Sequence, residues 1–186
     1  MGKDVLLGVT GSIAAYKAAE LARGLVRAGH SVHVVMTRSA QEFITPLTFQ
    51  TLTGNKVHTE MFERLEAPNV EHVSLAKRVD LVILAPATAN LIGKLAGGIA
   101  DDMLTTVCMA AWQKPMILCP AMNTAMYENP FHQANLRKLQ ETLECTILQP
   151  RQAELACGDV GRGALAEVSD ILTAALKKLE DIHGND

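Results

Sequence analysis

The stretch DVLLGVTGSIAAYKAAELARGLVRAG, residues 4–29, decides the fold. Its first six residues form a short apolar run that stops at a Thr-Gly-Ser turn, which predicts a buried β-strand. Residues 13–29 then place apolar side chains at helical spacing and finish on Gly29, a residue type that commonly ends helices. A strand followed directly by such a helix predicts the first half of a βαβ unit.

The same alternation continues along the chain. Short runs rich in Val, Ile and Leu predict further strands at residues 31–37, 80–86, 115–120 and 145–150. Helical patterns cover residues 130–143 and residues 169–181, where we expect Ser169 to be the N-cap. Because the strands are apolar along their length, they are typical of parallel strands covered on both faces. We therefore predict an α/β fold, a three-layer sandwich with a parallel sheet.

Length and composition indicate one domain spanning residues 1–186. Hydrophobic residues make up 48% of the chain, enough for one sizeable core. The net charge is −3 and the basic residues are scattered, so we expect neither a nucleic-acid partner nor a membrane partner. The N-terminal apolar run is too short for a signal peptide or a membrane span, and we expect a cytoplasmic protein.

The four cysteines are Cys108, Cys119, Cys145 and Cys157, without CxxC pairing or Cys/His ligand spacing, so no metal site is predicted. The first three stand in apolar contexts typical of small buried side chains. Cys157 lies in ELACGDVGRG, residues 154–163, whose glycines and charges predict a loop. Both a partly buried loop thiol and a functional thiol remain open for it.

In a sheet of this kind, ligands bind beyond the carboxyl ends of the strands. Gly11 and Ser12 follow the first strand, where small residues before a helix form either an ordinary tight turn or a phosphate site. Thr37 and Ser39 follow the second strand and fit either N-capping or ligand binding. These loops should meet at one edge of the sheet.

Two later loops carry further candidates. Thr88 and Asn90 follow the strand at 80–86 and offer neutral donors and acceptors, which suit a polar ring edge better than a metal. Asn123 follows the strand at 115–120, where an amide can recognise a ligand, while Met122 beside it also fits a core position. His72 stands near the start of a predicted short helix, as either a surface residue or a base.

Five motifs in order resemble the homo-oligomeric flavin-containing cysteine decarboxylases and together cover nearly the whole chain. They are GVTGSIAAYK at 8–17, FITPLTFQTLTG at 43–54, EHVSLAKRVDLVILAPATANLIGKLAGGIADD at 71–102, PAMNTAMYENP at 120–130 and ACGDVGRG at 156–163. The resemblance implies a flavodoxin-like or Rossmann-like domain that binds FMN. It also implies a trimer with the active site between neighbouring subunits, or a dodecamer of four such trimers.

The resemblance assigns roles to individual positions. His72 is the active-site histidine, Asn123 holds the substrate carboxylate, and Cys157 is the proton donor on a glycine-flanked flap. Met126 and Ala156 join Asn123 in substrate binding. The implied cofactor site consists of Gly11, Ser12, Ile13, Thr37, Ser39, Phe43, Pro86, Ala87, Thr88 and Asn90.

The implied reaction is FMN-dependent decarboxylation of the small molecule 4'-phospho-N-pantothenoylcysteine to 4'-phosphopantetheine in coenzyme A biosynthesis, through thioaldehyde and enethiol intermediates. Two alternatives are a peptidyl-cysteine oxidative decarboxylase of lantibiotic type, which would stop at the enethiol, and a non-catalytic regulatory homologue. The presence of Cys157 argues against the first, and the presence of His72, Asn123 and Cys157 together argues against the second. A flavin prenyltransferase would not be expected to carry PAMNTAMY and ACGD.

One segment departs from the family pattern. Members often carry GPGRM after ACGD, whereas this chain reads GRGAL at residues 161–165. The departure puts the contacts of Arg162 with substrate in doubt. Many bacterial relatives also carry a second domain that joins cysteine to phosphopantothenate, so this sequence fits either a separate decarboxylase or one domain of a longer protein.

Overall fold

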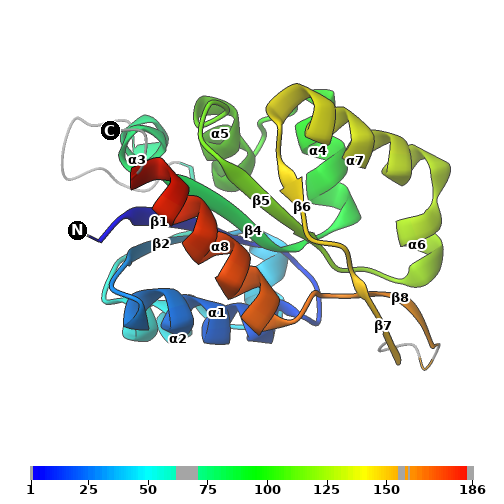
Figure 1. The fold of residues 1–186 in the computed structure, drawn as a ribbon, viewed down its shortest axis with the longest axis horizontal. Helices are drawn as coiled ribbons and strands as arrows, with labels where there is room; N and C mark the ends of the chain where they lie inside the picture. Colours follow the sequence, from blue (N-terminus) through cyan, green and yellow to red (C-terminus); the bar gives the residue numbers. More distant parts are fainter. Residues whose placement is uncertain (1, 62–70, 155–157, 159, 184–186) are drawn as a thin grey trace.

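The computed structural model describes residues 2–61, 71–154, 158 and 160–183. Within this part of the chain, six parallel strands form one sheet in the order β3-β2-β1-β4-β5-β6 (Figure 1). The strands are β1 Asp4–Val9, β2 Ser31–Met36, β3 Val57–His58, β4 Leu81–Ala87, β5 Met116–Pro120 and β6 Thr146–Ile147. The predicted parallel sheet is confirmed.

The edge strand β3 decides which doubly wound topology the sheet has. With β3 included, the order 3-2-1-4-5-6 is that of a Rossmann sheet. Without these two residues, the remaining five strands follow the flavodoxin order 2-1-3-4-5. In both cases the order reverses between β1 and β4, and this reversal opens the crevice where doubly wound proteins bind ligands.

Helices cover both faces of the sheet (Figure 1). One face carries α1 Ala15–Arg27, α2 Pro46–Thr53 and α8 Val168–His183, and the other carries α3 Glu71–Arg78, α4 Ala89–Gly97, α5 Met103–Ala110 and α7 Pro130–Leu143. Successive side chains of β1 point to opposite layers, so Val5 and Leu7 pack under α1 while Leu6 packs on the other side. Among the helices described, none has both the length and the apolar character needed to cross a membrane.

The boundaries of α1 and α8 refine the sequence predictions. Helix α1 begins at Ala15, two residues later than predicted, and Gly29 follows its end at φ +91°, a conformation that favours glycine. Ser169 is not the N-cap of α8, because the helix already begins at Val168. The backbone N–H groups of Asp170 and Ile171 both donate to the Glu167 carbonyl, which moves the start of the helix upstream.

Two segments differ more clearly from the prediction. The run predicted as a strand at 145–150 forms only the two residues of β6. Part of the predicted loop at 154–163 is a strand, because β8 Val160–Ala164 pairs antiparallel with β7 Arg151–Glu154. Main-chain pairing of this hairpin needs no apolar pattern, and so no periodicity in the sequence indicates it.

Candidate functional site

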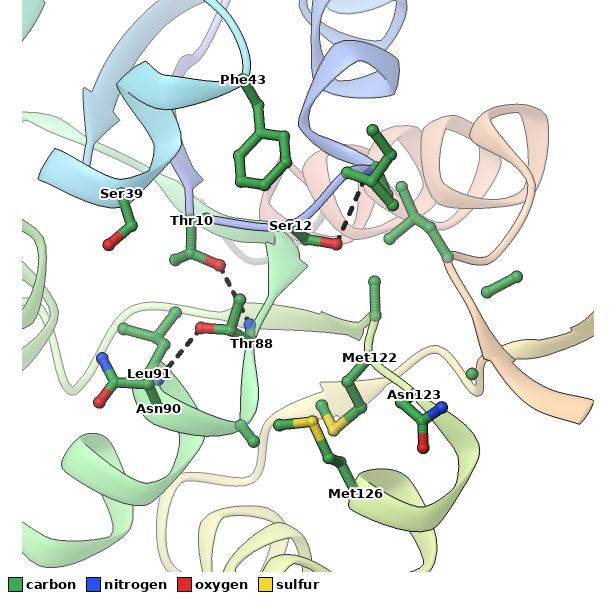
Figure 2. A pocket seen from close by; sticks show the side chains of 18 of the residues that line it. Thr10, Ser12, Ser39, Phe43, Thr88, Asn90, Leu91, Met122, Asn123 and Met126 are labelled. Atoms are coloured by element: carbon green, nitrogen blue, oxygen red, sulfur yellow. Dashed lines mark hydrogen bonds between the residues drawn. The ribbon is translucent and has the colours of Figure 1, made fainter. Parts of the chain in front are cut away.

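A cavity of about 850 Å³ opens at the carboxyl ends of β1, β2, β4 and β5 (Figure 2). Its volume lies in the range of small-molecule and cofactor sites. The loops that follow these four strands all contribute to its lining, as the sequence analysis predicted. The β7–β8 hairpin adds a further wall through residues of both its strands.

The turn after β1 lines the cavity with Gly11, Ser12 and Ile13. The Ser12 hydroxyl accepts a hydrogen bond from the Ala14 backbone N–H at 3.3 Å, which orders the entry into α1. A Cβ atom added to Gly11 would lie 2.4 Å from Cβ of Ser39, so only glycine lets this turn meet the loop after β2. The two predicted phosphate loops are therefore in direct contact.

Thr10 joins the β1 turn to the β4 loop. Its buried hydroxyl donates to the Pro86 carbonyl at 2.6 Å and accepts from the Thr88 backbone N–H at 3.0 Å (Figure 2). The hydroxyl of Thr88 in turn accepts from the Leu91 N–H at 3.4 Å, which caps α4. The sequence showed Thr10 only as part of a turn, because its partners lie 76 and 78 residues away.

The other predicted cofactor residues fall into two groups. Thr37, Ser39, Phe43 and Asn90 line the cavity, and Thr37 also caps the 3₁₀ helix η1 Arg38–Glu42 by accepting from the Ala40 N–H. For Thr37, the capping alternative is therefore confirmed, and it does not conflict with lining the cavity. Pro86 and Ala87 belong to β4 and are not among the residues that line the cavity. The Pro86 carbonyl accepts from the hydroxyl of Thr10, which does line the cavity, and the Ala87 carbonyl accepts from the backbone N–H of Ala121, another lining residue.

Asn123 stands at the end of β5 and at the start of α6 Thr124–Glu128. Its side-chain oxygen accepts from the Ala125 N–H at 2.8 Å and caps this short helix. Met122 and Met126 line the cavity beside it (Figure 2), and Met122 also packs against the core. The cap fixes the orientation of the Asn123 amide at the cavity wall.

The β7–β8 hairpin is seated on the Asn123 loop through its main chain. The Met122 N–H donates to the Gly163 carbonyl at 3.0 Å. A Cβ atom on Gly163 would lie 2.1 Å from the Met122 carbonyl oxygen, and one on Gly161 would lie 2.2 Å from the Thr124 hydroxyl oxygen. Both glycines therefore permit a contact that any side chain would block. The predicted site residues Ala156 and Cys157 lie outside the described residues.

His72, a predicted catalytic residue, does not lie at the cavity. It is half-buried in the first turn of α3 and is not among the lining residues. Helix α3 lies at the opposite end of Figure 1 from α6. The neighbouring Glu71 carboxylate binds Nδ1 of His58 and Nζ of Lys56, each at 3.1 Å, which ties the start of α3 to β3. One chain therefore places His72 and Asn123 apart.

Charged side chains of the cavity wall were not singled out from the sequence. Nζ of Lys94 lies 2.7 Å from Oδ1 of Asp101 and 3.2 Å from Oδ2 of Asp102. The hydrogen bond that the Lys94 ammonium donates to Asp101 is the main cause that raises the pKa of Lys94, and the same bond lowers the pKa of Asp101. Lys17, Arg38 and Arg151 also line the cavity. Among the described residues, no group of His, Cys, Asp and Glu side chains is arranged to hold a metal ion.

Three thiols are buried, as the sequence predicted for them. Cys108, Cys119 and Cys145 all lie in the apolar layers. Burial raises the pKa of the Cys108 thiol to about 12 and also raises the pKa of the other two thiols. These cysteines therefore stay protonated and unreactive near neutral pH.

The short helix α6 packs on α7 through the rings of Tyr127 and His132. Tyr127 is buried, its hydroxyl donates to the side-chain oxygen of Gln149, and its carbonyl accepts from Nε2 of Gln133. The His132 ring packs against it with the ring centroids 5.7 Å apart. Within the described residues, neither ring nitrogen of His132 has a hydrogen-bond partner, and burial lowers its pKa below the usual 6.5.

We expect His132 to make stability depend on pH. Below about pH 6.5 the unfolded chain binds a proton at this position that the folded protein excludes, so the free energy of unfolding falls by up to about 1.4 kcal/mol per pH unit. The variant His132→Leu removes this group. Urea unfolding at pH 7.5 and pH 5.5 should show a smaller loss of stability for the variant than for the wild type. Equal losses in the two proteins would contradict the prediction.

The sequence matches a protein-family model described as Flavoprotein over residues 1–180. The probable phosphopantothenoylcysteine decarboxylase of Streptococcus mutans is 46% identical over 173 residues, which cover 92% of this chain and 96% of that protein. The coenzyme A biosynthesis bifunctional protein CoaBC of Bacillus subtilis is 47% identical over 175 residues. These cover 94% of this chain but 43% of CoaBC, so the chain spans less than half the length of that bifunctional relative.

Two solved structures share the fold closely. A cysteine-to-serine mutant of a PPC decarboxylase, complexed with pantothenoylaminoethenethiol, superimposes with a TM-score of 0.84 at 33% sequence identity. The match covers 97% of this chain and 100% of that chain. The FMN-binding protein AtHal3 superimposes with a TM-score of 0.81 at 34% identity, covering 97% of this chain and 98% of that chain.

Proposed function

The chain belongs to the flavoprotein family, alongside the phosphopantothenoylcysteine decarboxylases, and from this membership we propose that it decarboxylates 4'-phospho-N-pantothenoylcysteine to 4'-phosphopantetheine with FMN as cofactor. The observation that carries the proposal is the 46% identity to a decarboxylase named for this substrate, over nearly the full length of both chains. The protein would act in the cytoplasm on a small molecule, as one decarboxylase domain in coenzyme A biosynthesis, without nucleic-acid or membrane partners.

The cavity fits FMN. Gly11 provides a close approach between the β1 turn and the loop after β2, where Ser12 and Ser39 offer hydroxyl groups suited to a phosphate. Thr88 and Asn90 offer neutral polar groups to a ring edge, and the half-exposed ring of Phe43 lies at the same cavity. When bound, FMN supplies a reversible two-electron acceptor, which decarboxylation of a cysteine requires because a bare carbanion would be unstabilised.

The chain's own residues would position the substrate and move its protons. The amide of Asn123, oriented by its cap on α6, would donate hydrogen bonds to the substrate carboxylate. His72 would accept a proton from the substrate, and Cys157 would return one to the enethiol carbon. The two electrons that the saturated thiol also needs are those that the cofactor, as a reversible acceptor, would give back. Apolar side chains such as Met122 and Met126 would exclude water around the carboxylate.

The proposed active site lies between subunits of a trimer, or of a dodecamer of trimers. Its support is that the cavity of one chain includes Asn123 but not His72. A neighbouring copy could supply the histidine. Large apolar side chains are also exposed on this chain, including Trp112 at 55% and Phe131 at 83%, and aromatic residues of this kind are enriched at interfaces.

The reaction is tested with purified protein and the phosphorylated substrate. We expect a yellow protein with an FMN spectrum that releases CO₂ and forms 4'-phosphopantetheine, identified by mass spectrometry. A peptidyl-cysteine decarboxylase would instead accept a peptide ending in cysteine and stop at the enethiol. Colourless protein that releases no CO₂ even with added FMN would refute the proposal.

The shared site is tested by mixing two inactive variants, His72→Asn and Asn123→Asp. A mixed trimer would retain one intact site of three, with the histidine of one subunit and the asparagine of the next. Random mixing in equal amounts should restore roughly a quarter of the wild-type activity, because about three quarters of the trimers contain both variants. Subunits must be exchanged by mild denaturation or coexpression. No recovery in trimers shown to be mixed would place both residues in one chain's site.

A further inference from the structure

Two cations of the cavity wall have no counter-ion in the described part of the chain. Lys17 and Arg38 line the cavity, and neither side chain has an ion-pair or hydrogen-bond partner among the described residues. The other two lining cations differ, because Lys94 is bound by Asp101 and Asp102, and Arg151 lies 3.0 Å from Oε1 of Glu167.

Because Lys17 lines the cavity, its lack of a counter-ion among the described residues indicates that an anionic ligand could bind there. Lys17 is half-buried on α1 and lines the cavity. A cation at the wall of a cavity attracts an anionic ligand more strongly than a cation in open solvent does, because the walls of the cavity have a low dielectric constant. No acidic residue stands in the first turn of α1 or of η1, so the chain supplies no negative charge at these helix starts either.

The two cations come from segments that touch each other. Lys17 follows the β1 turn by one helical turn, and Arg38 stands directly before Ser39. Gly11 and Ser39 are so close that a Cβ atom on the glycine would lie 2.4 Å from the serine Cβ. Lys17 and Arg38 therefore line the same cavity as Ser12 and Ser39, from two segments that touch each other.

We propose that Lys17 and Arg38 form a cation pair that recognises the phosphate monoester of a ligand in this cavity. The inference rests on the proposed function, which brings two phosphates to the site, one on FMN and one on the substrate. Together these groups carry a charge of about −3 to −4 at neutral pH. A lysine acts as a point charge on phosphate, while an arginine can donate two parallel hydrogen bonds.

The cofactor arm of the test measures binding of FMN and of riboflavin, which lacks the phosphate. Full-length Lys17→Met and Arg38→Met proteins are stripped of flavin, and flavin fluorescence is titrated at fixed ionic strength. If the pair holds the FMN phosphate, each variant weakens FMN binding by about tenfold to a hundredfold and leaves riboflavin binding within about twofold. Lys17→Arg keeps the charge and should recover most of the affinity. Arg23→Met, on an exposed part of α1 away from the cavity, is the control.

The substrate arm compares 4'-phospho-N-pantothenoylcysteine with N-pantothenoylcysteine at saturating FMN. If the pair holds the substrate phosphate, the KM of the phosphorylated substrate rises by about tenfold or more while that of the other substrate does not. Two results would refute the proposed role of Lys17 and Arg38 in phosphate binding. In the first, the variants bind phosphorylated ligands as much more tightly than unphosphorylated ones as the wild type does, in both arms. In the second, the variants lose affinity equally for phosphorylated and unphosphorylated ligands. An FMN-specific loss in a protein without decarboxylase activity refutes the proposed function and supports the pair.

Discussion

Asn123→Asp lowers kcat/KM for decarboxylation by about 100-fold or more in our expectation. An aspartate can still accept from the Ala125 N–H, so the cap on α6 and the local fold are kept. What changes is the group that we propose meets the substrate carboxylate, since the two N–H donors of the amide are replaced by a negative charge. Steady-state release of CO₂ measures the effect, and the FMN spectrum should be unchanged.

Asn129 provides a matched control for this substitution. Its side-chain oxygen accepts from the Phe131 N–H at 2.9 Å and caps α7 in the same way, but Asn129 does not line the cavity. Asn129→Asp introduces the same charge six residues away and should leave kcat/KM within about twofold. If both variants lose activity equally, the effect of Asn123→Asp is a general effect of charge and not the loss of a carboxylate contact.

Cys157→Ser should release CO₂ and yet fail to make the saturated thiol. Serine is a far weaker acid than cysteine, so the enethiol carbon would not receive its proton, and a product lacking two hydrogen atoms would accumulate. Its chemical precedent is the related PPC decarboxylase, solved as a cysteine-to-serine mutant with pantothenoylaminoethenethiol. Mass spectrometry of the product distinguishes the two outcomes directly.

The other thiols make this experiment specific. Because Cys108, Cys119 and Cys145 are buried and stay protonated, a thiol reagent at neutral pH should modify Cys157 first. We expect one rapidly labelled thiol per chain in the wild type and none in Cys157→Ser. Saturated product formed by Cys157→Ser at the wild-type rate would show that another group delivers the proton.

The predictable parts of the fold are the elements whose residues show a local hydrophobic periodicity. The strand and helix within residues 4–29 have strong periodicity and a glycine stop, and both are observed. Strand β3 has two residues, too few for any pattern, although it distinguishes the Rossmann order from the flavodoxin order. The β7–β8 hairpin was missed because main-chain hydrogen bonds and two glycines hold it.

The site was predictable to a similar extent. Because carboxyl ends of parallel strands meet at one edge, Ser12, Ser39, Asn90 and Asn123 could be expected around one cavity, and they line it. The bonds of Lys94 with Asp101 and Asp102 depend on the turn between α4 and α5, which spacing alone does not reveal. The distance of His72 from the cavity follows from tertiary structure and could not be derived from a motif.

In the β7–β8 hairpin, largely different residues attach the cavity wall and form its surface. In the described part of the chain, the hairpin's contacts with the Asn123 loop are the close approaches of Gly161 and Gly163 and the main-chain carbonyl of Gly163. GRGAL keeps both glycines of the family's GPGRM and changes only the residues around them. Substitutions at the residues beside these two glycines, such as Ala164, which lines the cavity, can therefore change the surface of the cavity wall while the main-chain attachment of the hairpin stays as it is.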